Sequence, residues 1–267
     1  MQILGTAASG LRAQQMSLDL VADNMANVNT PGYKAAQMDF AETMAAQAAG
    51  ATRPGSVNAG VGTAAGQVGL GAGVLERATG RNLAQGDIHA TANPLDLAID
   101  GAGYFQVALP NGQIAYTRAG AFRLDANRQI VDSQGHPLVP GVTLPSGSGA
   151  PTVSADGQIK VTDLQGREQT VGRMVLANFP NPESMQDIGN NLLLPQANTG
   201  PVQTGRPGAM SGNTALGFIH GGALEQSNVS LADTMADLIK VQRAYQLNAR
   251  MVEDGDQMWA IADAIRA

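Results

Sequence analysis

Apolar residues recur at seven-residue steps at both ends of the chain. The first stripe is Leu4, Leu11, Leu18 and Met25, with Val21 on the interleaved positions, and the second is Leu231, Leu238, Tyr245, Val252 and Trp259. A seven-residue step keeps one stripe of an α-helix against a neighbour along its whole length, as in a coiled coil. The pattern predicts a helix at each end and indicates that the two helices are halves of one assembly.

A second apolar set on the last helix widens its face. Its members are Ala244, Met251, Met258 and Ile265. A face this wide requires more than one partner helix. Ordering each terminal residue costs about 1–2 kcal/mol of backbone entropy, and few large side chains lie on the stripes to offset it. We expect the ends to be poorly ordered in the free monomer and to fold when several copies pack together.

Start and stop signals delimit the two helices. The first is expected over about 2–27, because Pro31 lacks an N–H group and Gly32 admits a positive φ, so the chain can reverse there. The second is expected to begin at Ser230, with Asp233 three residues later in a capping-box arrangement. Gly255 weakens this helix midway.

Between the helices the apolar period changes from seven to two. Short alternating segments start at Leu95, and turn signals such as Pro110-Asn111-Gly112 and Ala155-Asp156-Gly157 separate them. Closely spaced turns between short strands predict an antiparallel β domain that ends near His220.

The expected fold class is α+β. Residues 1–34 and 228–267 form terminal helices paired in a coiled-coil-like layer, and 95–220 form an antiparallel all-β domain. Residues 35–94 form an extended Gly/Ala-rich connecting region, with its most Gly-rich tract at 48–73, and 221–227 form a return linker.

Composition excludes several classes of function. The formal net charge is −6, and charged residues make up 14% of the chain, well below the roughly 25% usual for soluble domains. Nucleic acid is not an expected partner, because no Lys/Arg cluster is present to bind phosphates. The chain has no cysteine. It also shows no secretory signal pattern and no long apolar run, so neither a cleaved signal peptide nor membrane insertion is expected.

Candidate chemistry is sparse. His89, His136 and His220 are isolated, and no Gly-x-Ser-x-Gly nucleophile elbow occurs. The spacing of Asp96, Asp100, Asp125 and Asp132 matches no calcium-binding loop. We therefore expect no catalytic residue, no cofactor and no metal site, and we interpret the chain as non-enzymatic.

Three ordered segments carry a resemblance to a known family. They are Ala26-Asn27-Val28-Asn29-Thr30-Pro31-Gly32-Tyr33-Lys34, then 95–107 (LDLAIDGAGYFQV) with 116–120 (YTRAG), and finally 227–229 (SNV) with 242–248 (QRAYQLN). Together they resemble the bacterial flagellar basal-body rod and hook proteins. The length resembles the distal rod type, FlgG or its relative FlgF, and the segment Gln242-Arg243-Ala244-Tyr245 favours FlgG.

The resemblance implies a structural subunit that polymerises into a helical tube, transmits torque from motor to hook and surrounds an export channel. It implies inner terminal helices, an outer β domain, and a signature turn that sets the reversal between these layers. The turn comprises Ala26, Asn27, Asn29, Thr30, Pro31, Gly32 and Tyr33. The implied partners are further copies, the proximal rod and hook proteins and the surrounding bushing rings. The implied location is the basal-body rod, reached by type III export.

Three alternatives stay open at this point. A FlgF-type rod protein or a compact hook subunit would differ in its neighbours within the flagellum. A secreted β-rich hydrolase would require a pocket of convergent Asp and His side chains. A module that binds peptidoglycan or a bushing ring could coexist with the rod role.

Overall fold

The computed structural model describes residues 2–42, 74–163, 165–211 and 214–266. The Gly-rich tract at 48–73 lies outside the described residues. The chain separates into two compact units, which are described here one at a time. The helical unit comprises 1–23, 36–80 and 232–267, and the β-rich unit comprises 24–35 and 81–231.

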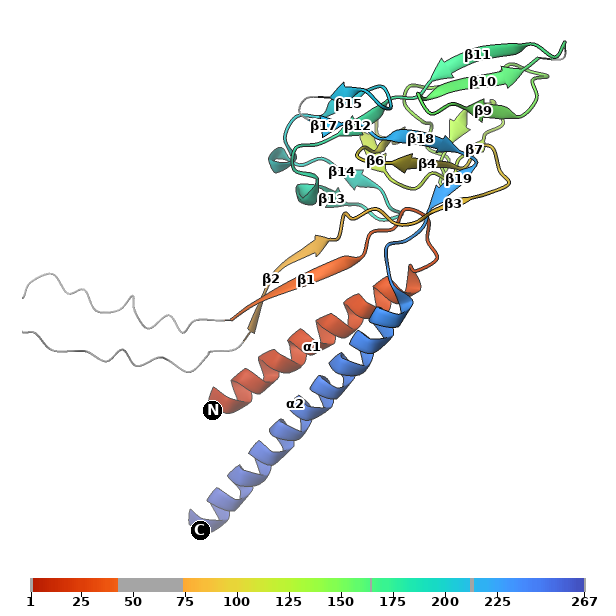
Figure 1. Ribbon diagram of the computed structural model, residues 1–267. Coiled ribbons are helices and arrows are strands. Elements are labelled where there is room, and N and C mark those ends of the chain that lie inside the picture. The colour runs from red at the N-terminus through yellow and green to blue at the C-terminus, as the bar shows by residue number, and fades with distance from the viewer. Residues whose placement is uncertain (1, 43–73, 164, 212–213, 267) are drawn as a thin grey trace, which may run out of the picture. The chain divides into compact units, whose positions relative to one another are not determined.

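The helical unit contains the two long helices. Helix α1 spans Gln2–Ala26 and helix α2 spans Leu231–Arg266. They run antiparallel, with both chain termini at the same end of the unit (Figure 1). They approach closely at Gly10, because a Cβ atom built there would lie 3.2 Å from Asn248 Nδ2. Strands β1 (Ala36–Glu42) and β2 (Val74–Arg81) form a two-stranded sheet.

The predicted helix boundaries are confirmed. Helix α1 ends one residue before the expected limit, and α2 begins directly after Ser230 with Asp233 in its first turn. Gly255 is buried within α2, although it lies in the middle of a helix that is otherwise largely exposed. Gly255 follows Val241 and Asn248 at steps of seven residues, and Asn248 is the residue that approaches Gly10. Gly255 therefore lies on the packed side of α2.

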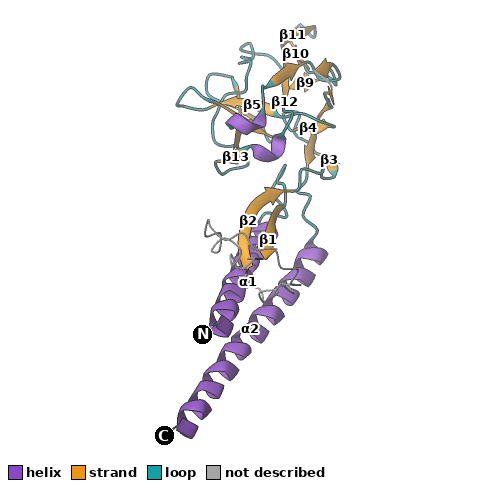
Figure 2. Ribbon diagram, turned by 90° about the vertical axis from the view of Figure 1, so that its left-hand side faces the viewer, coloured by secondary structure: helices purple, strands orange, loops and turns teal. Residues whose placement is uncertain are grey.

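The β-rich unit consists of short strands in several small sheets (Figure 2). The strands are β3 (Ile88–Ala90), β4 (Leu97–Asp100), β5 (Phe105–Ala108), β6 (Ile114–Thr117), β7 (Arg123–Leu124), β8 (Ile130–Val131), β9 (Pro151–Val153), β10 (Gln158–Thr162), β11 (Glu168–Arg173), β12 (Leu176–Asn178), β13 (Gln186–Asp187), β14 (Leu193–Leu194), β15 (Gln203–Gly205), β16 (Met210–Ser211), β17 (Thr214–Ala215), β18 (Phe218–Gly221) and β19 (Ala223–Glu225), with 3₁₀ turns η1 (Pro182–Ser184) and η2 (Ala197–Thr199).

The antiparallel character predicted for this region is confirmed. The sheets have the strand orders β13-β14-β6-β5, β11-β10-β9, β12-β15, β16-β17, β18-β4, β19-β3 and β7-β8. In the pairs β18–β4 and β19–β3, late strands of the unit return to early ones. Strand β19 lies within 221–227, where the sequence indicated only a linker, and β3 lies within the connecting region.

One continuous core holds the β-rich unit together. Leu97, Ile99, Phe105 and Val107 are fully buried and pack with Ile219 from β18. Alternation places these side chains on one face of their strands, as the period of two predicts. A second cluster forms around Phe179, whose ring meets the Tyr116 ring edge-on at a centroid distance of 4.7 Å. The unit therefore completes a hydrophobic core within a single chain.

Candidate structural site at the signature turn

The predicted turn after α1 is stabilised by its own hydrogen bonds. Thr30 N donates to Asn27 O at 3.1 Å, and Tyr33 N donates to Thr30 O at 3.2 Å. The Thr30 hydroxyl also donates to Asn27 Oδ1 at 3.2 Å. The turn therefore pairs two of its backbone N–H groups with carbonyls of the same turn and joins the side chains of Asn27 and Thr30 to each other.

Gly32 has two separate reasons to lack a side chain. Its φ is +69°, in the left-handed region that glycine tolerates best. A Cβ atom built there would lie only 2.6 Å from Arg118 C and from Ala119 N. Gly32 N donates to Glu225 O at 2.8 Å. The turn thus lies against backbone of the second family segment, at Arg118 and Ala119, and is hydrogen-bonded to the backbone at Glu225, shortly before the third segment.

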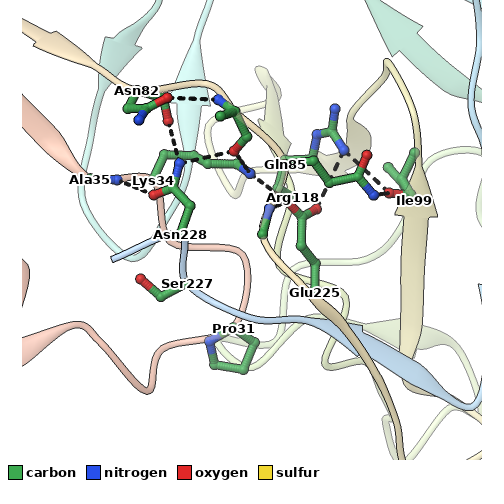
Figure 3. Close-up of polar contacts among 12 residues, drawn as sticks. Pro31, Lys34, Ala35, Asn82, Gln85, Ile99, Arg118, Glu225, Ser227 and Asn228 are labelled. Atoms are coloured by element: carbon green, nitrogen blue, oxygen red, sulfur yellow. Dashed lines mark hydrogen bonds and ion pairs between the residues drawn. The ribbon is translucent and has the colours of Figure 1, made fainter. Parts of the chain in front are cut away.

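A buried ion cluster lies beside this turn (Figure 3). The ammonium of Lys34 contacts Glu225 Oε1 directly and donates to Ala84 O at 2.7 Å. The Glu225 side chain is fully buried, and Gly86 N donates to its Oε1 at 3.0 Å. Burial lowers the pKa of Lys34 from its ordinary value, and the neighbouring carboxylate opposes this only in part.

Arg118 extends the cluster from the other side of Glu225. Its Nη1 lies 3.4 Å from Glu225 Oε2, and its Nη2 donates to Gly101 O at 2.8 Å. The guanidinium also lies over the Tyr104 ring, 5.3 Å from the centroid. A planar guanidinium with several fixed donors suits this combination of carboxylate, carbonyl and ring.

Asn228 ties three segments together through one side chain. Ala35 N donates to its Oδ1 at 2.8 Å, and its Nδ2 donates to Asn82 O at 2.8 Å and to Ala84 O at 2.9 Å. Figure 3 shows this amide, on the segment that leads into α2, between Ala35 and Asn82. A side chain that satisfies backbone on two other segments fixes their register.

The remaining turn residues divide into anchored and exposed positions. The Tyr33 hydroxyl donates to Asn24 Oδ1 at 3.1 Å, and Asn191 Nδ2 donates to Pro31 O at 3.1 Å. Ala26 and Asn29 are exposed. The structure therefore brings Asn27, Thr30, Pro31, Gly32 and Tyr33 into the site and leaves Ala26 and Asn29 outside it.

The residues predicted for subunit packing lie on the two long helices with different exposures. Val21 is buried, and Leu11, Leu18, Met25, Leu238 and Val252 are half-buried. Leu231 and Tyr245 are exposed. Leu4 and Trp259 lie in the helices, but their side chains are outside the described part of the structure. Several further apolar side chains of α2 are exposed, namely Met235, Ile239, Leu247, Met251, Met258 and Ile261.

His136 has a structural role in a turn. His136 Nδ1 lies 2.9 Å from Asp132 Oδ2, and Asp132 Oδ1 accepts from the backbone of Gln134 and His136 at 2.8 Å each. This arrangement closes the turn between β8 and the following segment. Within the described ranges no group of three or more acidic or histidine side chains could hold a metal ion. Across the same residues, neither α1 nor α2 has a long enough apolar run to cross a bilayer.

Sequence reasoning missed Glu225 and did not single out Arg118. Each is a charged residue in a chain with few charges, and this scarcity was the available signal. The sequence could not supply the pairing, because Lys34 and Glu225 are 191 positions apart.

Comparison with known proteins gives a consistent result along the chain. The family description "Flagella basal body rod protein" matches residues 4–34, "Flagellar hook protein FlgE/F/G D1 domain" matches 98–161, and "Flagellar basal body rod FlgEFG protein C-terminal" matches 220–265. The flagellar basal-body rod protein FlgG of Borreliella burgdorferi is 35% identical, with 100% of this chain and 99% of the relative covered. The FlgG protein of Caulobacter vibrioides is 36% identical, with 100% of both chains covered. The FlgF protein of Mesorhizobium japonicum is 30% identical, with 93% and 91% covered.

Proposed function

The chain belongs to the flagellar basal-body rod protein family, as a member of its FlgG type, and on this premise we propose that it is a structural subunit of the distal rod. In this proposal copies of the chain associate into a helical tube that transmits torque from motor to hook. The terminal helices surround the export channel and the β-rich unit lies outside them. The role is mechanical, and no observation favours the hydrolase alternative.

One observation carries the proposal. Helix α2 exposes apolar side chains along its length, including Leu247 at 60%, Met251 at 52% and Met258 at 59%. Contiguous exposed apolar surface of this kind marks an interaction site in a soluble protein. Burying such side chains against neighbouring copies stabilises an assembly by about 1.5–3 kcal/mol each.

The second supporting feature is the approach of α1 to α2 at Gly10 and Asn248. Small residues let two helices come close, and the stripe of the half-buried Leu238 and Val252 lies next to the series that contains Asn248. We propose that this stripe forms the coiled-coil-like seam between the two helices. The rest of α2 then remains available to other copies, and the pairing becomes fully ordered only in the rod.

The signature turn would act as a fixed joint in this mechanism. A torque-bearing subunit must not bend where its chain leaves the first helix. The buried contacts among Lys34, Glu225 and Arg118, together with the Asn228 amide, hold the turn to the segment that leads into α2. Buried and fully paired polar networks of this kind specify one geometry.

Partners and location follow from the same premise. The rod would join proximal rod proteins at one end and hook proteins at the other, inside the bushing rings, after type III export. A FlgF-type role is less well supported, since the FlgF relative is less similar than the two FlgG relatives.

The proposal is tested by blocking the seam. We expect Leu238→Asp or Tyr245→Asp to abolish sedimentable rods of the full-length chain while amide signals of the β-rich unit keep their positions. Gln246→Asp is the matched control, because Gln246 is exposed and lies on neither apolar stripe. Normal rods from the Leu238 and Tyr245 variants would refute the assignment of this stripe.

A further inference from the structure

Two exposed methionines share one side of helix α2. Met251 and Met258 are seven residues apart, which places them only about 20° apart around the helix axis. They belong to an apolar stripe whose members are each at least half exposed, namely Ile239, Leu247, Met251, Met258 and Ile261. Two of the five side chains in this stripe therefore carry a thioether sulfur.

Other methionines of the chain have different surroundings. Met235 is exposed on α2 but lies about 160° around the axis from Met251, between two aspartates near the start of the helix. Met210 is exposed on β16 in the β-rich unit, and Met174 is buried in the core of that unit. The chain thus contains methionines that are exposed within the stripe, exposed outside it, and buried.

An exposed thioether reacts with peroxides. The sulfur attacks one oxygen of hydrogen peroxide, a sulfur–oxygen bond forms, and the oxygen–oxygen bond breaks. The other oxygen leaves as hydroxide and takes the proton of the first to become water. The sulfur loses two electrons and the peroxide gains them, so the products are a sulfoxide and water. A flexible apolar side chain has then become a polar one.

Oxidation of both sulfurs makes the stripe unsuitable for burial. The sulfoxide oxygen accepts hydrogen bonds, and removing it from water without a donor is unfavourable. Asp254 already lies on the same side of α2 between the two methionines. After oxidation only three of the five apolar members of the stripe are unchanged. A surface that attracted apolar partners is then largely polar.

We propose that Met251 and Met258 form an oxidation-sensitive pair that controls the association of the free chain. A peroxide converts the pair to sulfoxides, and the oxidised stripe no longer binds a neighbouring copy. This inference rests on the proposed function, in which α2 packs against other copies. Methionine sulfoxide reductase reverses the modification and with it the block. The assembled rod protects the pair, because the contact that uses the stripe also covers its sulfurs.

Peptide mass spectrometry after treatment with hydrogen peroxide locates the sulfoxides in the full-length chain. In the free chain Met251, Met258 and Met210 should be oxidised, while the buried Met174 stays reduced and shows that the β-rich unit remains folded. In rods treated for the same time, Met251 and Met258 should lose most of their reactivity. Equal rates of oxidation in rods and in the free chain would show that the stripe stays uncovered and would overturn the proposal.

Assembly of the oxidised chain is the second measurement. Peroxide treatment should raise the critical concentration for rod formation by about tenfold or more, since burial of one side chain of this size contributes about that factor. The reductase should restore the original value. Met251→Leu/Met258→Leu keeps the stripe apolar and should assemble equally well with and without peroxide. Met251→Gln/Met258→Gln makes the stripe polar and should assemble poorly without any oxidant.

Met210→Leu/Met235→Leu is the matched control. It removes the same number of exposed thioethers, leaves the stripe unchanged, and should remain as sensitive to peroxide as the unmodified chain. Full sensitivity of the Met251→Leu/Met258→Leu variant, resistance of the control, or normal rods from the Gln variant would overturn the role of the pair while the proposed function stands. Failure of the unmodified, reduced chain to assemble would overturn both.

Discussion

The two units of this protein distribute their apolar side chains in opposite ways. In the β-rich unit Phe105 is 0% exposed, whereas in α2 of the helical unit Ile261 is 60% exposed. The β-rich unit satisfies its hydrophobic residues within one chain. The described part of α2 leaves several of them on its surface. A polymer subunit needs both kinds of region: one that is stable before assembly and one that gains stability from assembly.

Charged groups show the same contrast. Lys34 in the β-rich unit is buried with Glu225 and Arg118, while Lys240 on α2 is exposed beside Asp237. The buried Lys34 ammonium helps to fix the signature turn within the chain. The exposed group lies beside another exposed side chain, where water screens the pair.

The largest expected effect comes from the core. Phe105→Ala should destabilise the β-rich unit by about 3–5 kcal/mol, because it removes a fully buried ring and leaves a cavity. Leu247→Ala should change the stability of the free chain by no more than about 0.5 kcal/mol. Urea denaturation followed by amide NMR signals of each unit measures both. Equal losses would show that the helical unit is as self-sufficient as the β-rich one.

The ion cluster should contribute slightly less. Glu225→Ala leaves Lys34 and Arg118 without their shared carboxylate and should cost about 3 kcal/mol, at the lower end for broken buried pairs since both cations keep some solvent contact. Glu168→Ala removes the exposed partner of Lys160 and should cost at most about 1 kcal/mol. The same denaturation experiment compares them, and a similar cost for both variants would mean that burial adds nothing to the cluster.

The signature glycine should be distinguishable from an ordinary turn glycine. Gly32→Ala should cost about 2–3 kcal/mol, because the new methyl group meets the Arg118–Ala119 backbone in addition to the unfavourable φ. Gly112 has a φ of +82° but open space around it, so Gly112→Ala should cost only about 1 kcal/mol. Thermal unfolding of the two variants gives the comparison. Indistinguishable midpoints would indicate that the close approach at Gly32 is readily relieved.

The smallest effect concerns proton binding by two lysines. Burial lowers the pKa of Lys34 below 10.5, whereas hydrogen bonding to Asp237 raises that of Lys240 above 10.5. At pH values between the lowered pKa and 10.5, the unfolded chain binds the Lys34 proton more tightly than the folded chain does. The free energy of unfolding therefore rises with pH in this window. The contribution of Lys240 is fully present below 10.5 and is lost as pH rises through its raised pKa.

Site-resolved NMR titration of the lysine side chains measures these two shifts. Global unfolding cannot separate them, because burial also raises the pKa of Tyr104 in the same pH range, with the opposite sign to Lys34. Shifts of both lysines in the same direction would contradict the difference between the two environments.

Local sequence patterns predicted much of the fold. Seven-residue periodicity and the Ser230–Asp233 cap predicted both helices and the start of α2, since these signals depend on residues within one or two turns of each other. Alternation predicted the longer strands such as β5 and β10. It did not predict two-residue strands such as β13 and β16, because a segment of two residues is too short to show a repeat.

By itself, the sequence determined where the two helices and the longer strands form, that charges are scarce, and where α1 ends in a turn. Only the tertiary structure decided that Lys34, Arg118 and Glu225 share one buried cluster and that Gly32 lies against the backbone of Arg118 and Ala119. The physical reason is the range of the interactions. Backbone preferences and side-chain periods act between near neighbours along the chain, whereas these contacts join segments that are far apart in the sequence and adjacent only in the folded β-rich unit.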